Sequence, residues 1–340
     1  LCSLIAGCVW AQAPAEIALS DRLSLHTSLA VGAPAFCPKY GWEYPYTAKG
    51  YVIRPGRDND KHLAFRLHAQ SRKYARLMES AGRMLLRLWD FTNSKIGIDH
   101  PAQYGRIVDV YLAEGGKPGG EQGFFVSKSS RDNYHRYNAI YIYHLQDFTY
   151  PAEMAREVAH EYGHAVLPPV GGFQNPEDWG NGYLGENLFL KWMAADKALA
   201  KEDAMGATKA ELDAWVRKNV TPLERSIWRF GPQTRLLAGK GQRALDEYVG
   251  LFLYVAQAFP DQLGRCMLLA GGQDATSALN GVMEGINERS AWVIEVPAYA
   301  RGDIWLPIRG KVDIQGAKRT TWKGEGMKVT AYRSRIEIRR

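Results

Sequence analysis

The stretch PAEMAREVAHEYGHAVLPP, residues 151–169, decides how the rest of the chain is interpreted. His160 and His164 are four residues apart, so in a helix they lie on one face and can bind a single metal ion. The stretch predicts that helix, because Pro151 suits a first helical position and Pro168 ends the helical run.

Glu161 follows the first histidine and can accept a proton from a metal-bound water. His-Glu-x-x-His is the pattern of zinc peptidases for this reason. A catalytic zinc takes three protein ligands and leaves one position open for water. We therefore expect one zinc ion per chain, with His160 and His164 as ligands and Glu161 as the general base.

Three downstream carboxylates are candidates for the third ligand. Glu186 lies 22 residues after His164 and is expected to begin a helix. The other residues on the helical face that contains Glu186 are apolar. Glu186 is expected to point inward, where a carboxylate must be paired or bound to metal. Glu177 and Asp178 are the alternatives, although they lie in a loop with no helix to aim them. We expect Glu186 to be the ligand.

This arrangement resembles the gluzincin branch of the zincin metallopeptidases. The run YLGENLF, residues 183–189, is similar to the segment that carries the ligand glutamate in aminopeptidase-type gluzincins. Metzincins instead have a third histidine six residues after the second, and that position is Val170 here. The resemblance covers mainly residues 105–195 and implies a two-lobed α+β zincin fold that hydrolyses peptide bonds without a covalent intermediate.

The chain also departs from the family pattern. Leu190 takes the place of the aspartate that supports the ligand glutamate in thermolysin-like members. The GxMEN motif that binds a free amino terminus is not found, so an endopeptidase is expected and not an aminopeptidase. An inactive zincin-like protein that binds a cell surface or carbohydrate is the alternative function, and a zinc hydrolase of cell-wall amides is a third.

Two further parts of the site are predicted. The resemblance implies a donor, often Tyr or His, that stabilises the oxyanion, and Tyr248 on a later helix is the candidate, with a core tyrosine as the alternative. The alternating segment 138–145 is expected to be an edge strand at the rim of the site, where Ile140, Tyr141 and Ile142 pair with an extended peptide. The glycine-rich segment 114–123 is expected to be a loop beside the cleft or a plain connector.

Periodicity predicts the remaining elements. Helical spacing covers 63–91 and much of 200–290, β-branched residues predict a strand at 106–113, and short strands begin at Ala291. The fold class is therefore α+β. We expect a catalytic domain at 16–290, with an upper lobe to about 170 and a helical lobe at 171–290, followed by a β extension at 291–340.

Residues 1–15 are an apolar run followed by small residues, as in the h-region and cleavage site of a signal peptide. We expect a secreted or periplasmic protein whose sequence begins inside that signal. Ile5 to Cys8 also resembles a lipobox, so a lipoprotein anchored to the membrane at Cys8 is the alternative. Cys37 and Cys266 could then pair in an oxidising compartment, or Cys266 could be a buried thiol.

The composition of the 340 residues is 46% hydrophobic, which excludes a disordered chain. The net charge of +7 comes from dispersed basic residues, so a nucleic-acid partner is not expected, whereas contact with an anionic cell-surface polymer is compatible with it. After the leader, no segment has about 20 uninterrupted apolar residues, so no transmembrane helix is expected. The expected partner is a protein or peptide substrate.

Overall fold

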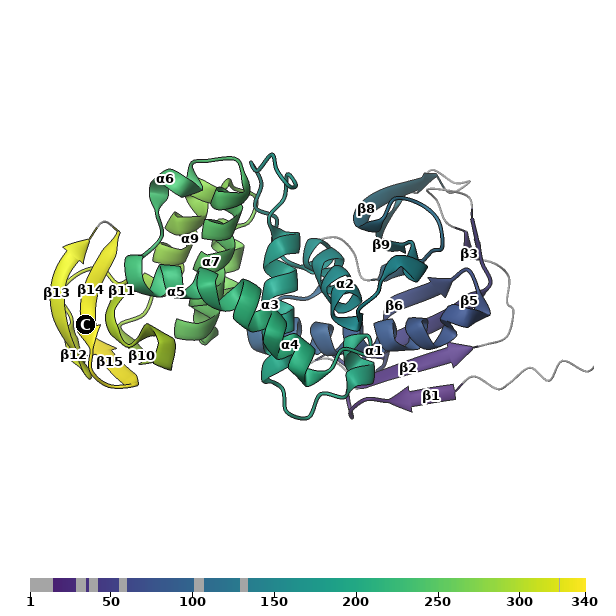
Figure 1. The fold of residues 1–340 in the computed structure, drawn as a ribbon, viewed down its shortest axis with the longest axis horizontal. Coiled ribbons are helices and arrows are strands. Elements are labelled where there is room, and N and C mark those ends of the chain that lie inside the picture. Colours follow the sequence, from purple (N-terminus) through teal and green to yellow (C-terminus); the bar gives the residue numbers. More distant parts are fainter. Residues whose placement is uncertain are drawn as a thin grey trace, which may run out of the picture.

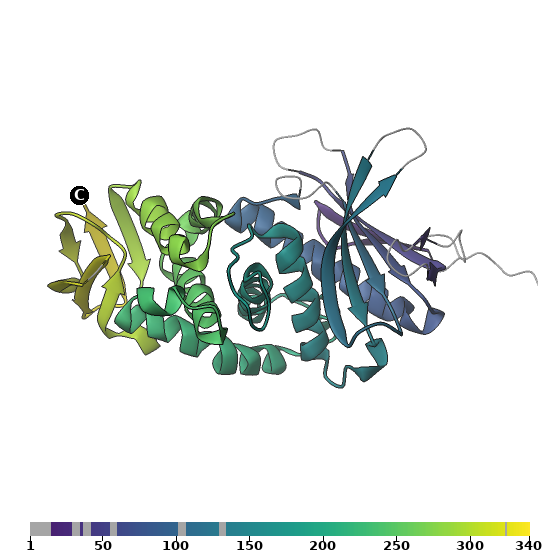
Figure 2. The same ribbon diagram turned by 90° about the horizontal axis from the view of Figure 1, so that it is seen from above.

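The computed structural model describes residues 15–28, 35–36, 42–54, 60–100, 107–128, 134–323 and 325–340. A mixed β-sheet lies at one end of an elongated molecule, helices fill the middle, and a group of short strands lies at the other end (Figures 1 and 2). The fold class is α+β, as predicted from the sequence.

Seven strands form the main sheet in the order β1-β2-β5-β6-β7-β9-β8. The pairs β6–β7 and β7–β9 are parallel and the other pairs are antiparallel. The strands are β1 (Ala15–Ala18), β2 (Leu23–Ser28), β5 (Tyr46–Val52), β6 (His62–Ala69), β7 (Val108–Leu112), β8 (Gly119–Lys128) and β9 (Tyr134–Tyr143). Separately, β3 (Ala35–Phe36) pairs antiparallel with β4 (Glu43–Tyr44).

The helix predicted over 63–91 is only partly present. Residues 62–69 form β6, and the helix α1 (Ala75–Phe91) begins after it. Strand β6 is hydrogen-bonded on both sides, to β5 and β7, and its Phe65 and Leu67 are fully buried. Leu63, Phe65 and Leu67 alternate with small or polar residues, which is a strand pattern. This pattern lies only a few residues before the helical spacing of α1, so the prediction joined the two segments into one helix.

The strand predicted at 138–145 exists as β9, but it is not an edge. Strand β8 pairs along the full length of β9 and is the outermost strand of the described sheet, while β7 pairs on the other side. Ile140, Tyr141 and Ile142 are each 0% exposed, so they are core residues and the prediction that they contact a substrate is wrong. The glycine-rich segment predicted as a loop continues into β8 and takes the edge position.

Helices α1 and α2 (Pro151–Val166) cover one face of the sheet, where Leu67, Val110 and Ile140 join them in a common core. On the opposite face, Tyr111 and Tyr141 stack with ring centroids 4.9 Å apart. Helix α2 begins with proline and ends before Pro168, as predicted, and His160 and His164 lie in its second half.

Helix α3 (Asn181–Ala195) packs directly on α2. The two helices touch at glycines: a Cβ atom on Gly163 would lie 2.9 Å from the Cα of Gly185. Because neither position has a side chain, the backbones approach closely, and residues of α3 reach the histidines of α2. Helix α3 begins five residues before Glu186, where the sequence predicted its start.

The remaining helices form the middle of the molecule between α3 and the C-terminal strands (Figure 1). They are α4 (Lys209–Trp215), α5 (Thr221–Phe230), α6 (Thr234–Leu237), α7 (Gln242–Ala258), α8 (Leu263–Ala270) and α9 (Ala275–Asn287). Cys266 on α8 is a buried thiol, and burial raises its pKa to about 12. Cys2, Cys8 and Cys37 lie outside the described residues, as does the predicted leader up to residue 14.

Short strands begin at Ala291, as predicted, and form two three-stranded antiparallel sheets, β10-β15-β12 and β11-β14-β13. They are β10 (Ala291–Glu295), β11 (Gly302–Leu306), β12 (Asp313–Gln315), β13 (Ala317–Lys323), β14 (Gly326–Ala331) and β15 (Arg335–Arg339). The hydroxyl of Tyr254 on α7 donates to the carbonyl of Trp305 at 2.9 Å and ties these strands to the helices. In the described part of the chain, no helix combines the length and hydrophobicity that a membrane crossing needs.

Candidate metal centre

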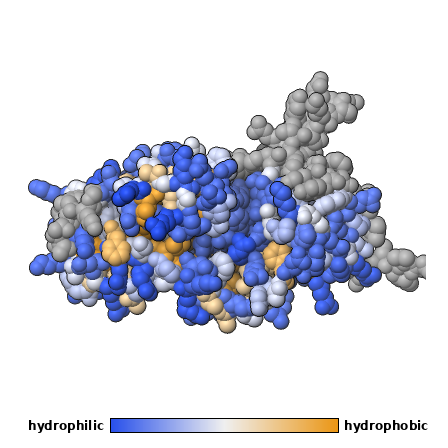
Figure 3. Space-filling model, turned by 45° about the horizontal axis from the view of Figure 1, so that its top comes forward, coloured by the Kyte–Doolittle hydropathy of each residue, from blue (hydrophilic) through white to orange (hydrophobic). Residues whose placement is uncertain are grey.

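The two motif histidines face a cavity of about 550 Å³ that opens between the first strand residues of β8 and the loop before α3. In the space-filling view, the middle of the molecule is hollowed and mainly hydrophilic (Figure 3). Both imidazole rings come from α2, one helical turn apart, with ring centroids separated by 4.9 Å. The spacing of four residues therefore places both rings on the same side of α2, as predicted from the sequence.

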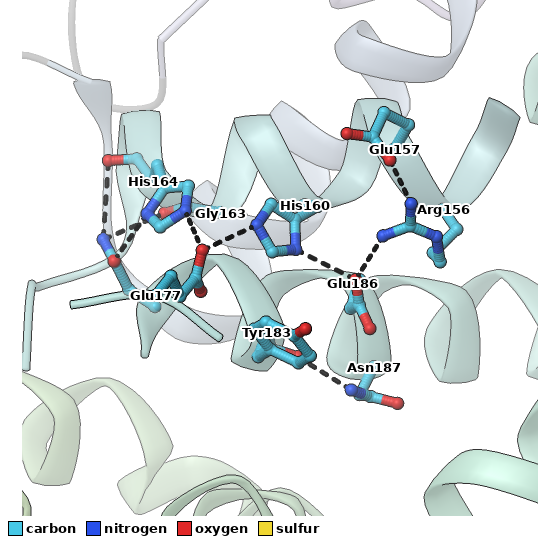
Figure 4. A network of polar contacts seen from close by, with 10 residues as sticks. Arg156, Glu157, His160, Gly163, His164, Glu177, Tyr183, Glu186 and Asn187 are labelled. Atoms are coloured by element: carbon cyan, nitrogen blue, oxygen red, sulfur yellow. Dashed lines mark hydrogen bonds and ion pairs between the residues drawn. The ribbon is translucent and has the colours of Figure 1, made fainter. Parts of the chain in front are cut away.

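Helix α3 holds each ring by its Nδ1 atom (Figure 4). The Nδ1 of His160 donates to Oε2 of Glu186 at 2.9 Å, and the Nδ1 of His164 donates to Oδ1 of Asn181 at 2.8 Å. The amide group of Asn181 donates to the carbonyl of Leu167 at 3.0 Å, which leaves its oxygen as the acceptor. With both Nδ1 atoms bonded to α3, both Nε2 atoms face Glu177 and the cavity, and in the neutral imidazole each Nε2 would carry the lone pair that a metal ligand requires.

The third member of the group is Glu177. Its Oε2 atom lies 3.1 Å from Nε2 of His160 and 3.2 Å from Nε2 of His164. The three potential ligand atoms all lie within 4.8 Å of one another. Glu177 lies in the loop between α2 and α3, and it is one of the two alternatives to Glu186 that the sequence offers as third ligand.

Glu186 points inward and is 5% exposed, as predicted, but it lies on the other side of the ring. Its carboxylate binds Nδ1 of His160 and accepts from Arg156 at 2.9 Å. The two nitrogens of an imidazole point in divergent directions, so a group on Nδ1 cannot share a metal with Nε2 of the same ring. The structure corrects the choice of third residue, because Glu186 holds His160 from behind while Glu177 faces the cavity.

Backbone contacts hold the loop that carries Glu177. The amide of Gln174 donates to the carbonyl of Lys240 at 2.7 Å, and the amide of Gly171 donates to the carbonyl of Gln273 at 3.1 Å. The loop closes on itself where Gly180 donates to Val170 at 2.9 Å. Lys240 and Gln273 lie 66 and 102 residues further along the chain than the loop residues that they bind. Local sequence patterns therefore do not predict the position of Glu177.

Two of the three separations between the potential ligand atoms fit a tetrahedral zinc. Ligand bonds of about 2.0–2.2 Å place neighbouring ligand atoms about 3.3 Å apart, close to the two distances made by Glu177. Gly182 supplies the space: a Cβ atom there would lie 2.7 Å from Nε2 of His160 and would collide with Nε2 of His164. Two histidines and one carboxylate are also a donor set typical of catalytic zinc.

The charges around the histidines also suit a cation. Burial lowers the pKa of His160, but its hydrogen bonds to Glu177 and Glu186 outweigh burial and raise the pKa to about 10. Burial raises the pKa of Glu177, yet the two imidazoles hold it at about 2. Carboxylates therefore surround the rings with negative charge, and a metal ion would supply the compensating positive charge.

Glu161 is 3% exposed and lines the same cavity. Its Oε2 atom is buried and has no hydrogen-bond partner among the described residues. Burial raises the pKa of its carboxyl group to about 7, although the neighbouring imidazoles lower it in part. A Cβ atom on Gly120 of β8 would lie 2.7 Å from Oε1 of Glu161, so this glycine lets the edge strand approach the carboxylate.

Tyr248 does not line this cavity. It is 1% exposed and packs against Phe173 and Phe252, with ring centroids 5.6 and 5.3 Å away, which makes it the core tyrosine of the alternative interpretation. Tyr183 lines the cavity instead, with its ring 5.2 Å from that of His160. Burial, with Glu186 and Glu177 nearby, raises the pKa of Tyr183, so its hydroxyl keeps its proton.

Sequence reasoning missed Asn181, Gly182 and Tyr183. All three lie in the first turn of α3, and their contacts with the motif depend on the close packing of two helices. The available signal was the run of small residues at Gly182 and Gly185, which is unusual inside a helix and indicates a close approach. Comparisons of the chain with family models, with curated proteins and with solved structures find no match.

Proposed function

We propose that this protein is a zinc-dependent peptidase with a zincin-like, two-lobed catalytic domain. The observation that carries the proposal is the convergence of His160, His164 and Glu177 on one point beside Gly182, with the carboxylate of Glu161 in the same cavity. His160, His164 and Glu177 would hold the ion. A bound zinc would supply a Lewis acid that activates water and polarises the scissile carbonyl.

The residues around the proposed zinc would have separate roles in catalysis. Glu161 takes the proton from the attacking water and delivers it to the leaving amine, a role that its unpartnered Oε2 atom and its place in the cavity suit. Glu186 and Asn181 keep the two imidazoles in the Nδ1-protonated form. Tyr183 is the candidate donor to the developing oxyanion, in place of Tyr248.

The substrate would lie along β8. This outermost strand has its first residues, Gly119 to Gln122, in the wall of the cavity, and an extended peptide can add to such an edge by main-chain hydrogen bonds. The glycines at 119 and 120 keep side chains out of the space between the strand and α2. Substrate contact therefore moves from the predicted residues of β9 to the backbone of β8.

The test is a comparison of native protein with Glu161→Gln. Native protein should contain about one zinc per chain and should cleave an unfolded protein substrate, whereas Glu161→Gln should keep its zinc and lose about a thousandfold or more in rate. Equal activity in both would remove Glu161 from the mechanism. A zinc-loaded native protein that cleaves no peptide would favour the alternative, a zincin-like surface-binding protein.

Export to the periplasm or medium, anchorage through Cys8 and contact with a cell-surface polymer stay predictions from the sequence. Fractionation of cells that express the full gene tests the first two together. A soluble exported form would support cleavage of the leader, and a detergent-requiring form that becomes soluble on Cys8→Ala would support the lipid anchor.

A further inference from the structure

Helix α2 carries a stripe of carboxylates. Glu153, Glu157 and Glu161 are spaced by four residues and so lie along one side of the helix. Like charges at this spacing destabilise a helix, and burial of a carboxylate is costly. Even so, Glu157 is only 6% exposed and Glu161 only 3%. Arg156 pairs with Glu157 and offsets part of this cost, and the remaining negative charge along the stripe favours a role in binding.

The stripe connects two cavities. The first contains the candidate metal centre and Glu161. The second, of about 350 Å³, is lined by Glu153, by Asp147 and by the aromatic side chains of Phe148 and Trp215. Both cavities share Pro118, Gly119, Arg156 and Glu157, so they adjoin each other below the start of β8.

The two cavities are acidic in a basic protein. Seven carboxylate side chains and one guanidinium line them, whereas the chain as a whole has a net charge of +7. The one guanidinium, that of Arg156, is already paired with both Glu157 and Glu186 (Figure 4). A bound zinc would offset only part of the remaining negative charge, and the groove that the two adjoining cavities form would still attract cations.

Two glycines of β8 lie close to the stripe. A Cβ atom on Gly119 would lie 3.4 Å from Oε1 of Glu157, and one on Gly120 would lie 2.8 Å from it. Glu157 pairs with Arg156 through its other oxygen, Oε2. In the first cavity the Oε2 atom of Glu161 is buried without a partner among the described residues, which marks the groove as a place where a ligand completes the hydrogen bonding.

We propose that the second cavity is a specificity pocket for a lysine or arginine side chain of the peptide substrate, close to the scissile bond. The inference rests on the proposed peptidase function. The aromatic walls cover the aliphatic part of such a side chain, and Glu153 and Glu157 bind its charged end. A substrate with an acidic residue at this position is rejected by the same carboxylates.

The experiment uses the zinc-loaded full chain and a peptide library, before and after acetylation of its lysines, with cleavage sites determined by mass spectrometry. Native protein should cut with a lysine or arginine within two residues of the bond, and acetylation should reduce cleavage at the lysine sites by about tenfold, the effect of one charge-assisted hydrogen bond. Glu153→Arg should lose this preference. Glu284→Arg, an exposed position on α9 outside both cavities, is the matched control and should keep it.

The outcomes separate the two proposals. Cleavage that ignores basic residues, in native protein and in Glu153→Arg alike, would overturn the specificity pocket and leave the peptidase standing. If zinc-loaded native protein cleaves nothing, the peptidase proposal fails, and calorimetric titration with the same peptides decides the pocket. Binding of unmodified over acetylated peptide by about tenfold, lost in Glu153→Arg, would support it, and equal binding of the two peptides would overturn it.

Discussion

Two carboxylates lie on opposite sides of His160, one from a loop and one from a helix. Glu177, in the loop of residues 171–180, contacts the Nε2 atom, and Glu186, on α3, contacts the Nδ1 atom. Glu186 is the more deeply buried of the two and is also paired with Arg156, whereas Glu177 lines the cavity. The helix therefore supplies the fixed support, and the loop supplies the group that would face a bound ion.

The difference teaches that inward orientation and metal ligation are separate properties. Helical periodicity shows which side of its own helix Glu186 occupies, and that side is indeed buried. It does not show which ring nitrogen the carboxylate meets, because that depends on how far α3 is shifted along α2. The loop, which has no periodicity to interpret, is positioned by contacts with distant parts of the chain.

The largest effect is expected from removal of the loop carboxylate. Glu177→Ala should lower zinc affinity by more than about 100-fold, a larger loss than removal of an outer-shell partner causes. Competition with a chromophoric chelator measures this affinity. Asp178→Ala is the matched control, since Asp178 lines the same cavity but lies outside the group of three, and it should bind zinc nearly as native protein does.

Gly182→Ala should also lower zinc affinity, by about 100-fold, although it removes no ligand. The added Cβ atom would collide with Nε2 of His164 and displace the two imidazoles from the ion. Alanine favours a helix over glycine by about 1 kcal/mol, but displacement of the imidazoles would also disturb their Nδ1 hydrogen bonds to α3, so the metal-free protein should melt at a somewhat lower temperature. Zinc affinity equal to that of native protein would show instead that the rings can shift and still reach the ion.

Removal of the helix carboxylate should have an intermediate effect. Glu186→Ala should weaken zinc binding by about 10 to 100-fold, because His160 loses the acceptor that holds its ring and its tautomer. Glu186→Gln keeps an acceptor for Nδ1 and should bind zinc more tightly than the alanine variant. If Glu186→Ala lost zinc as completely as Glu177→Ala, the assignment of the two carboxylates would have to be exchanged.

The smallest effect is expected on hydrogen exchange when zinc is removed from the protein without substitutions. Removal of zinc by a chelator should increase amide hydrogen exchange in residues 172–179 more than in α3, because only the loop carboxylate is released. The amides of Gly171 and Gly180, at the ends of the loop, are hydrogen-bonded to the rest of the protein and should exchange little faster. Equal increases in the loop and in α3 would contradict the division into fixed support and movable ligand.

Much of the fold near the motif was predictable. The α+β class, the limits of α2, the strand at 108–112 and the short strands from Ala291 all follow from local patterns that the structure bears out. The strand β6 was missed although its apolar residues alternate, because this short pattern lies directly before the helical spacing of α1 and was joined to it. The edge position of β8 was not predicted either, since the order of strands in a sheet is decided by pairing between distant segments.

The sequence by itself determined that His160 and His164 share one face of a helix, that Glu161 stands beside them and that Glu186 points inward, because helical geometry relates residues a few positions apart. Only the tertiary structure decided that Glu177 completes the group of three, that Glu186 and Asn181 hold the rings and that Gly182 leaves space next to them. These relations depend on the packing of α2 against α3 and on a loop held by residues far along the chain. Contacts of this kind arise from the whole fold, and no local pattern encodes them.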